Sequence, residues 1–364
     1  MFFGRSAFID QIHAALLGSE GTKCFVLYGQ KRAGKSSILE HLKRKLAKSE
    51  CLPAFFSLQD IQGDLNICTF LTRIIQSVRD AVQIEAETHG IPSPFTFPTI
   101  AEVAASPILV FHDCLSQLVR ALKKTSSWEK QRIVLLVDEF TDVFAQIQQN
   151  KMPPEFMKLW KAIIERHYFS CVLIGKDIMP AFQAKFANEF GVTQDLRITY
   201  LSEQGARDLI EIPIGAERYR CRAVQRILEL TAGSPYYTMM VCDRLVEYIN
   251  RTKSFIVTEA DIEKVKESMI SGPQSLGAPK FDPLFDPGEK NVTTDIDPQD
   301  SLAGCSAIAK HANAGWCAAS SLPRMTFDKN KVITDLQHRD VIERKQDSYR
   351  IRVGLFHEWL LVNR

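Results

Sequence analysis

A glycine-rich octapeptide, GQKRAGKS at residues 29–36, limits the possible folds of this chain more than any other segment. It fits the pattern GxxxxGK(S/T), follows a short apolar run at Cys24–Tyr28, and precedes apolar residues at helical spacing. A strand, a glycine-rich loop and a helix in this order form a phosphate-binding loop, because the unpaired N–H groups at the helix start surround an anion. The sequence therefore predicts an α/β domain that binds a nucleoside triphosphate.

The loop residues have different expected roles. Lys35 supplies a full positive charge toward the β- and γ-phosphates and is assigned to catalysis as well as binding, and the Ser36 hydroxyl is placed to ligate Mg²⁺. The side chains of Lys31 and Arg32 could contact the γ-phosphate, but solvated charges are the favoured interpretation. The residues expected to bind the nucleotide here are Gly29, Gln30, Lys31, Arg32, Ala33, Gly34, Lys35, Ser36 and Ser37.

A second motif, RIVLLVDEF at residues 132–140, supplies two carboxylates. Its aliphatic run is typical of a central parallel strand covered on both faces, and open α/β sheets bind ligands where such strands end. We expect Asp138 to hold Mg²⁺ and Glu139 to orient or deprotonate the attacking water. Thr141 and Asp142 fit helix-capping residues better than chemical ones. ATP and Mg²⁺ are the predicted cofactors, and Glu139, Lys35 and Asp138 the catalytic residues.

Composition excludes several classes of protein. The formal net charge of +2 over 364 residues favours neither nucleic acid nor membrane as a partner. Nine cysteines are scattered without a CxxC pair, which predicts free thiols rather than a zinc site or disulfides. No apolar stretch approaches the length of a membrane helix, and the N-terminus lacks the pattern of a signal peptide. A soluble, cytoplasmic protein is expected.

Periodicity predicts several domains. Five strand-like runs alternate with amphipathic helices over residues 1–200, which predicts a doubly wound, mostly parallel α/β sheet whose fifth strand is Leu196–Leu201. Residues 201–271 are helical in period and predict a small lid. Residues 272–300, rich in Pro, Gly and Asp, predict a linker. Residues 301–364 alternate short helices with a strand-like Tyr349–Val353.

These motifs together resemble the STAND branch of the AAA+ ATPases, including the archaeal-type ATPases and their bacterial relatives, over nearly the whole chain. The resemblance rests on FFGR at the N-terminus, the two nucleotide motifs, GSP at 233–235 and YRIRVGLFHEWL at 349–360. It implies that residues 301–364 form a winged-helix domain after the α/β core and the lid.

The resemblance also implies further nucleotide contacts. Gly4 and Arg5 match residues beside the adenine pocket, Pro235 matches a proline near the base or ribose, and Lys176 lies just past the polar position of the sensor 1 strand. The competing interpretations are a structural ion pair for Arg5 and an ordinary surface lysine for Lys176.

Two departures from the family pattern bear on turnover. Val353 occupies the position nearest to a histidine that contacts the nucleotide phosphate in many relatives, and His357 follows one turn later. The stretch Ala181–Phe190, where ring-forming ATPases place an arginine finger, offers only Lys185. A resting-state histidine lock and a ring that fires through a trans arginine are therefore not expected.

The sequence favours an ATP-driven regulatory switch with slow hydrolysis, in signalling that includes antiviral defence in bacteria. Its expected partner is a separate protein effector or sensor, and a nucleotide-dependent homo-oligomer is also expected. We expect the chain to be an excised module or a subunit that acts on this effector. The alternative is a DNA-associated AAA+ ATPase of the origin-binding or transposition-helper type, which would use the basic region Asp328–Lys345 on DNA. A metabolic kinase is less favoured, and no base-reading NKxD pattern of a GTPase occurs.

Overall fold

A computed structural model describes residues 2–18, 21–125, 128–220, 222–272, 275–286 and 296–364. The chain divides into two compact units. One, the α/β unit, comprises residues 7–29 and 35–197. The other, the C-terminal unit, comprises the residues up to Ser6, residues 30–34 and residues 198–364. Five residues of the phosphate loop thus belong to the C-terminal unit, although the strand before them and the helix after them belong to the α/β unit.

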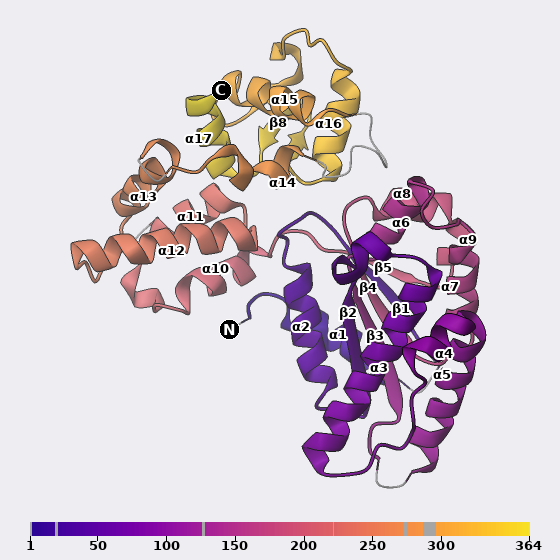
Figure 1. The fold of residues 1–364 in the computed structure, drawn as a ribbon. Coiled ribbons are helices and arrows are strands. Elements are labelled where there is room, and N and C mark those ends of the chain that lie inside the picture. The colour runs from indigo at the N-terminus through magenta and orange to yellow at the C-terminus, as the bar shows by residue number, and fades with distance from the viewer. Residues whose placement is uncertain (1, 19–20, 126–127, 221, 273–274, 287–295) are drawn as a thin grey trace. The chain divides into compact units, whose positions relative to one another are not determined.

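A five-stranded parallel sheet forms the centre of the α/β unit, with the strand order β2-β3-β4-β1-β5. Helices lie along both faces of the sheet (Figure 1), as the sequence predicts for a doubly wound fold. Residues 133–137 in β3 and all of β4 are buried, which fits the aliphatic run in β3 and the run Cys171–Ile174 in β4. The strands are β1 (Cys24–Tyr28), β2 (Cys51–Ser57), β3 (Arg132–Asp138), β4 (Ser170–Gly175) and β5 (Gln194–Arg197).

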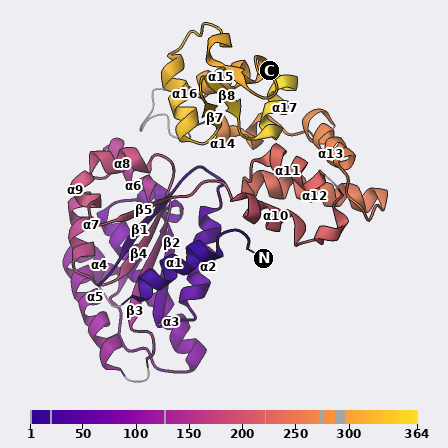
Figure 2. The ribbon, with the colours of Figure 1, turned by 180° about the vertical axis from the view of Figure 1, so that it is seen from behind.

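The helices of this unit connect its parallel strands. Figure 2 shows them from behind, around the same sheet. They are α1 (Ser6–Leu17), α2 (Lys35–Leu46), η1 (Leu58–Asp64), α3 (Ile67–His89), α4 (Ile100–Ala105), α5 (Pro107–Lys124), α6 (Thr141–Gln148), α7 (Phe156–Glu165), α8 (Met179–Lys185) and α9 (Ala187–Phe190).

The fifth strand differs from its prediction. The sequence predicts Leu196–Leu201, whereas β5 ends at Arg197. The chain enters the C-terminal unit at Ile198, and the Leu201 N–H donates to the carbonyl of Gly233 at 2.9 Å. The run Leu196–Leu201 is long enough for a strand, but its residues from Ile198 onward belong to the C-terminal unit, where Leu201 pairs with Gly233.

A buried aromatic cluster fixes the chain just beyond β3. The Phe140 ring lies 6.5 Å from the Phe70 ring, 5.6 Å from Trp160 and 6.0 Å from Phe182, centroid to centroid. All four side chains are at most 1% exposed. Aromatic pairs at such distances contribute beyond their buried area, so the residues immediately before Phe140 are held in place.

Among the described residues of 203–271, the regular elements are helices, as predicted for a lid, and one isolated bridge joins Tyr219 to Val257. The helices are α10 (Glu203–Glu211), η2 (Ala216–Arg218), α11 (Ala223–Thr231), α12 (Pro235–Thr252) and α13 (Glu259–Ser271). Ala232, in the left-handed conformation with φ of +52°, is the C-cap of α11. Gly233 follows with φ of +73° before α12.

The C-terminal residues form a winged helix, in which an antiparallel sheet of order β6-β8-β7 accompanies short helices (Figure 1). The expected strand Tyr349–Val353 is shorter, because α17 already begins at Gly354. Phe356, Trp359 and Leu360 are buried in the core, but Leu361 is exposed. The elements are α15 (Pro298–Lys310), β6 (Cys317–Ala318), η4 (Ala319–Ser321), α16 (Lys329–His338), β7 (Ile342–Lys345), β8 (Ser348–Ile351) and α17 (Gly354–Asn363).

Two short helices lie within the range expected as a linker: η3 (Ala278–Lys280) and α14 (Asp282–Phe285). Phe281 is fully buried, and Leu284 and Phe285 are also part of the core of the C-terminal unit. Residues 273–274 and 287–295 of this range lie outside the described residues. The boundaries 1–200, 201–271, 272–300 and 301–364 remain predictions.

Within the described ranges, no helix combines the length and apolar character needed to cross a bilayer. The eight cysteines in these ranges are free, and six of them are buried. Cys221 lies outside the described residues.

Candidate nucleotide-binding site

The lysine of the phosphate loop lies at the start of α2 and is 8% exposed. The Lys35 Nζ donates to the carbonyl of Gly29 at 2.7 Å. Burial lowers the pKa of Lys35, although the negative charges of Glu139, Asp177 and Asp138 oppose this effect. A desolvated ammonium group interacts strongly with an anion, which suits the phosphate contact expected for this residue.

The two expected metal ligands lie side by side. The Ser36 Oγ donates to Asp138 Oδ2 at 3.0 Å, and Asp138 Oδ1 accepts from the Glu139 N–H at 2.9 Å. Among the described residues, no cluster of three or more His, Cys, Asp or Glu side chains could hold a metal by itself. A hydroxyl and a carboxylate fit Mg²⁺, which binds few protein oxygens and completes its shell with phosphate and water.

The expected catalytic carboxylate has an unusual conformation. Glu139 has φ of +56°, a left-handed conformation that is uncommon for residues other than glycine and frequent at functional sites. Its Oε2 is buried without a hydrogen-bond partner among the described residues and lies 3.5 Å from the Lys176 Nζ. Burial raises the pKa of Glu139, while the charge of Lys176 opposes this rise.

Lys176 connects two carboxylates. Its Nζ lies 2.9 Å from Asp142 Oδ1 as well as 3.5 Å from Glu139 Oε2. The interpretation as an ordinary surface lysine is therefore wrong, and a contact to nucleotide remains a prediction. The assignment of Thr141 and Asp142 as helix caps is also wrong, because α6 has no side-chain cap. Asp142 instead pairs with Lys176, and Thr141 Oγ1 accepts from the Lys176 N–H at 3.3 Å.

Within the C-terminal unit, two phosphate-loop side chains bind the segment of η3 and α14. The Gln30 Nε2 donates to the carbonyl of Pro283 at 3.1 Å, and Gln30 Oε1 accepts from the Tyr200 hydroxyl at 3.1 Å. The Arg32 Nη1 donates to the carbonyl of Lys280 at 3.0 Å. Its guanidinium lies 4.2 Å from the centre of the Tyr236 ring. Arg32 and Lys31 are both exposed, as expected for solvated charges, but Arg32 also makes these two contacts.

Arg5, Gly34 and Pro235 come together in this unit. A Cβ placed on Gly34 would lie 3.8 Å from Pro235 Cγ and 4.0 Å from Arg5 Nη1. The Arg5 Nη2 donates to the carbonyl of Thr199 at 2.6 Å, but Nη1 is buried without a hydrogen-bond partner among the described residues. Burial lowers the pKa of Arg5 to about 10. A buried donor beside the phosphate loop fits an anionic ligand.

Gly4 has a packing role as well as its expected place near the nucleotide. Its φ is +71°, and a Cβ there would lie 2.8 Å from Gly205 Cα in α10. Both residues must therefore lack a side chain for the two backbones to approach this closely.

Several residues of this region are absent from the sequence-based prediction. Tyr236 follows GSP directly, so its position beside a motif was a usable signal. Tyr200, Lys280 and Pro283 gave no signal, because they contact the loop through tertiary structure.

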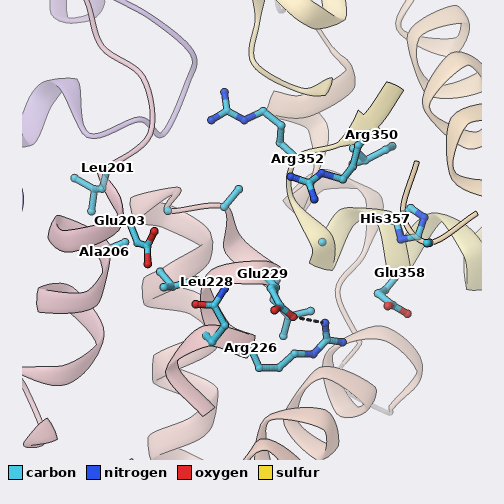
Figure 3. A pocket seen from close by; sticks show the side chains of 18 residues that line it. Leu201, Glu203, Ala206, Arg226, Leu228, Glu229, Arg350, Arg352, His357 and Glu358 are labelled. Carbon is cyan, nitrogen blue, oxygen red and sulfur yellow. Dashed lines mark hydrogen bonds and ion pairs between the residues drawn. The ribbon is translucent and has the colours of Figure 1, made fainter. Parts of the chain in front are cut away.

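A separate cavity of about 660 Å³ lies within the C-terminal unit (Figure 3). Residues of α10, α11, β8 and α17 line it, and none of the predicted nucleotide-binding residues is among them. Its charges largely pair: Arg226 with Glu229 at 3.3 Å, and Arg352 with Asp340 at 2.8 Å. His357 also lines this cavity, and Val353 is fully buried.

The strand–loop–helix at Gly29–Ser36, the carboxylates after β3, the helical lid and the winged helix define a P-loop NTPase of the AAA+ type. The sequence profile described as novel STAND NTPase 1 matches residues 1–240. The chain belongs to this family of STAND NTPases. No curated protein matches it significantly in sequence.

One solved structure shows the same fold, and two others are less similar. A Walker-type ATPase of Pyrococcus abyssi superposes with a TM-score of 0.62 at 12% identity, over 99% of this chain and 96% of that chain. Cdc6p from Pyrobaculum aerophilum gives a TM-score of 0.46 at 14% identity, over 98% and 92%. A RuvB variant from Thermotoga maritima gives 0.46 at 12% identity, over 96% and 92%. At 12% identity, the similarity to the Pyrococcus abyssi ATPase concerns the fold alone.

Proposed function

We propose that this chain is an Mg-ATP-binding regulatory switch that hydrolyses ATP slowly and acts on a separate protein effector, in signalling such as antiviral defence. The main support for the binding of Mg-ATP is the 3.0 Å hydrogen bond from Ser36 Oγ to Asp138 Oδ2. It joins the phosphate loop to the carboxylate strand, as a shared metal site requires.

The chain's own residues divide the work. Ser36 and Asp138 would hold Mg²⁺, and Lys35 with the N–H groups of the loop would bind the phosphates. Bound Mg²⁺ neutralises charge on the phosphate oxygens. Glu139 would orient the attacking water and accept its proton, a role that its raised pKa suits.

One feature of the sequence supports slow turnover. The stretch Ala181–Phe190 contains no arginine, and an arginine finger accounts for a large part of the rate in related phosphoryl-transfer enzymes.

The division of the phosphate loop supports a switch. Gln30, Arg32 and Gly34 belong to the C-terminal unit, whereas Lys35 and Ser36 belong to the α/β unit. Within the C-terminal unit, Gln30 and Arg32 donate hydrogen bonds to the carbonyls of Pro283 and Lys280. Nucleotide that binds one arrangement of the chain more tightly than the others would favour that arrangement. A difference in binding free energy of a few kcal/mol is enough to shift such an equilibrium.

The test of binding is Lys35→Ala, with the exposed Lys31→Ala in the same loop as the matched control. Loss of a charged contact worth about 1.5–3 kcal/mol weakens binding about 10- to 100-fold. Titration with a fluorescent ATP analogue in the presence of Mg²⁺ measures the affinity. Unchanged affinity in Lys35→Ala would refute the proposed site.

Hydrolysis is tested separately with Glu139→Gln. We expect this variant to keep its affinity for ATP and to lose phosphate release. Equal phosphate release by the wild-type chain and Glu139→Gln would remove Glu139 from the mechanism without affecting the binding proposal.

We do not propose the DNA-associated function. Within the region Asp328–Lys345, Arg339 is 6% exposed and binds Asp335 at 2.7 Å and the carbonyl of Leu284 at 3.1 Å. Arg344 pairs with Asp347 at 3.3 Å. These two arginines are therefore engaged within the chain.

A further inference from the structure

Three charged side chains meet where two neighbouring strands end. Glu139 follows β3, Lys176 follows β4, and the two strands pair in parallel with Val137 opposite Leu173. Asp142, in the first turn of α6, completes the group. A single ammonium group thus lies between two carboxylates, at 2.9 Å from Asp142 and 3.5 Å from Glu139.

Asp142 is the more deeply buried of the two carboxylates. Its side chain is 3% exposed, against 22% for Glu139. An ionised carboxylate in such a place is costly unless a cation pairs with it. The ion pair to Lys176 meets this requirement, and removal of one partner would leave the other charge uncompensated.

The backbone around this pair is fixed by contacts between α6 and the end of β4. The Phe140 N–H donates to the carbonyl of Ile174 at 2.7 Å, and the Lys176 N–H donates to Thr141 Oγ1 at 3.3 Å. A Cβ on Gly175 would lie 3.0 Å from Thr141 Cγ2. The start of α6 and the end of β4 are therefore packed directly against each other, which places Asp142 next to Lys176.

Glu139, by contrast, depends on a side-chain contact. Its backbone has the left-handed conformation, and its Oε2 forms an ion pair with Lys176 but has no hydrogen-bond partner among the described residues. The position of the Lys176 ammonium therefore determines where this carboxylate atom is held.

We propose that Asp142 is a positioning residue for ATP hydrolysis, which holds the Lys176 ammonium where it orients the Glu139 carboxylate. This inference rests on the proposed ATPase function. Asp142 acts through Lys176 and contacts neither nucleotide nor water in the reaction. Its loss leaves phosphate binding intact and misplaces the catalytic carboxylate.

The kinetic test is Asp142→Asn, a nearly isosteric change that removes the charge, with Asp142→Glu as the variant that keeps it. A displacement of about 1 Å at a reacting group can cost about 100-fold in rate. We expect kcat to fall by about 10- to 100-fold in Asp142→Asn while KM changes less than about 2-fold, and Asp142→Glu to recover part of kcat. Unchanged kcat, or a loss that appears in KM instead, would overturn the proposal.

A second readout needs no nucleotide. An amine-reactive reagent followed by mass spectrometry measures the reactivity of Lys176, with exposed Lys31 as the internal control. We expect Lys176 to react faster in Asp142→Asn than in the wild-type chain, Asp142→Glu to restore protection, and Lys31 to stay constant.

The two readouts separate two kinds of failure. Absence of ATP hydrolysis in the wild-type chain, together with the expected change in Lys176 labelling, would refute the proposed enzyme activity but not the placement of Lys176 by Asp142. Equal Lys176 labelling in the wild-type chain and Asp142→Asn, in a variant with an unchanged circular dichroism spectrum, would overturn the positioning role whatever the ATPase rate.

Discussion

Replacement of Phe281 by alanine measures the contribution of the segment between α13 and α15 to stability. Phe281 is fully buried, and its ring lies 5.8 Å from Tyr237, 5.3 Å from Phe356 and 5.1 Å from Trp359, centroid to centroid. Burial of a phenylalanine side chain contributes about 1.5–3 kcal/mol, and the cavity left behind adds to the loss. We expect Phe281→Ala to lower the free energy of unfolding by about 3–5 kcal/mol.

Urea unfolding followed by circular dichroism gives the overall loss, and hydrogen exchange locates it. Exchange of the amides in α17 should accelerate in Phe281→Ala, because Phe356 and Trp359 of that helix lose their ring contact. The matched control is Phe255→Ala, because Phe255 is 77% exposed; it should change stability by less than about 0.5 kcal/mol. Equal stability of the two variants would show that the segment is a passive connection and would refute its place in the core.

Three further predictions concern the C-terminal unit. In the absence of nucleotide, Arg32→Ala should remove about 1–2 kcal/mol of stabilisation that the contacts of Arg32 provide. Amide exchange in η3 and α14 should then become roughly 5- to 30-fold faster; unchanged exchange would contradict the contact. Burial raises the pKa of Asp261, but hydrogen bonds from the N-cap of α13 outweigh it, so the folded-state pKa is lowered. Asp261→Asn should therefore lower the stability at pH 7 by about 1 kcal/mol, which a lower thermal midpoint would show. The difference from the wild-type chain should vanish as the pH falls through that lowered pKa. Gly205→Ala places a Cβ 2.6 Å from Gly4 Cα and should cost about 1–3 kcal/mol in urea unfolding, whereas Gly277→Ala, at 3.4 Å from its nearest atom, should cost less.

The phosphate loop and the carboxylate strand could be predicted because their chemistry is local. Gly29, Gly34, Lys35 and Ser36 occupy fixed positions in one continuous segment, and the aliphatic run before Asp138 is itself the signal of a buried strand. The structure brings Ser36 and Asp138 together at 3.0 Å as that reasoning requires.

The missed features depend on contacts that no local pattern encodes. Asp142 has the spacing of a helix cap, and only the parallel pairing of β3 with β4 brings Lys176 next to it. Phe281 lies among prolines and aspartates, a composition typical of a linker, although its ring is buried by aromatic residues distant in sequence. Leu201 has the apolar neighbours of a strand but pairs with Gly233 in the lid.

The path of the chain between its two compact units has a consequence for limited proteolysis. A cut after Arg197 would produce fragments 1–197 and 198–364, yet the C-terminal unit draws residues from both. Gly4 packs on Gly205, Arg5 donates to Thr199, and Arg32 donates to Lys280. The second fragment alone would lack these contacts, and the surfaces that they cover would be exposed. A cut after Arg197 therefore does not separate the two compact units cleanly. Complementation by the first fragment, rather than independent folding, is the behaviour that this connectivity favours.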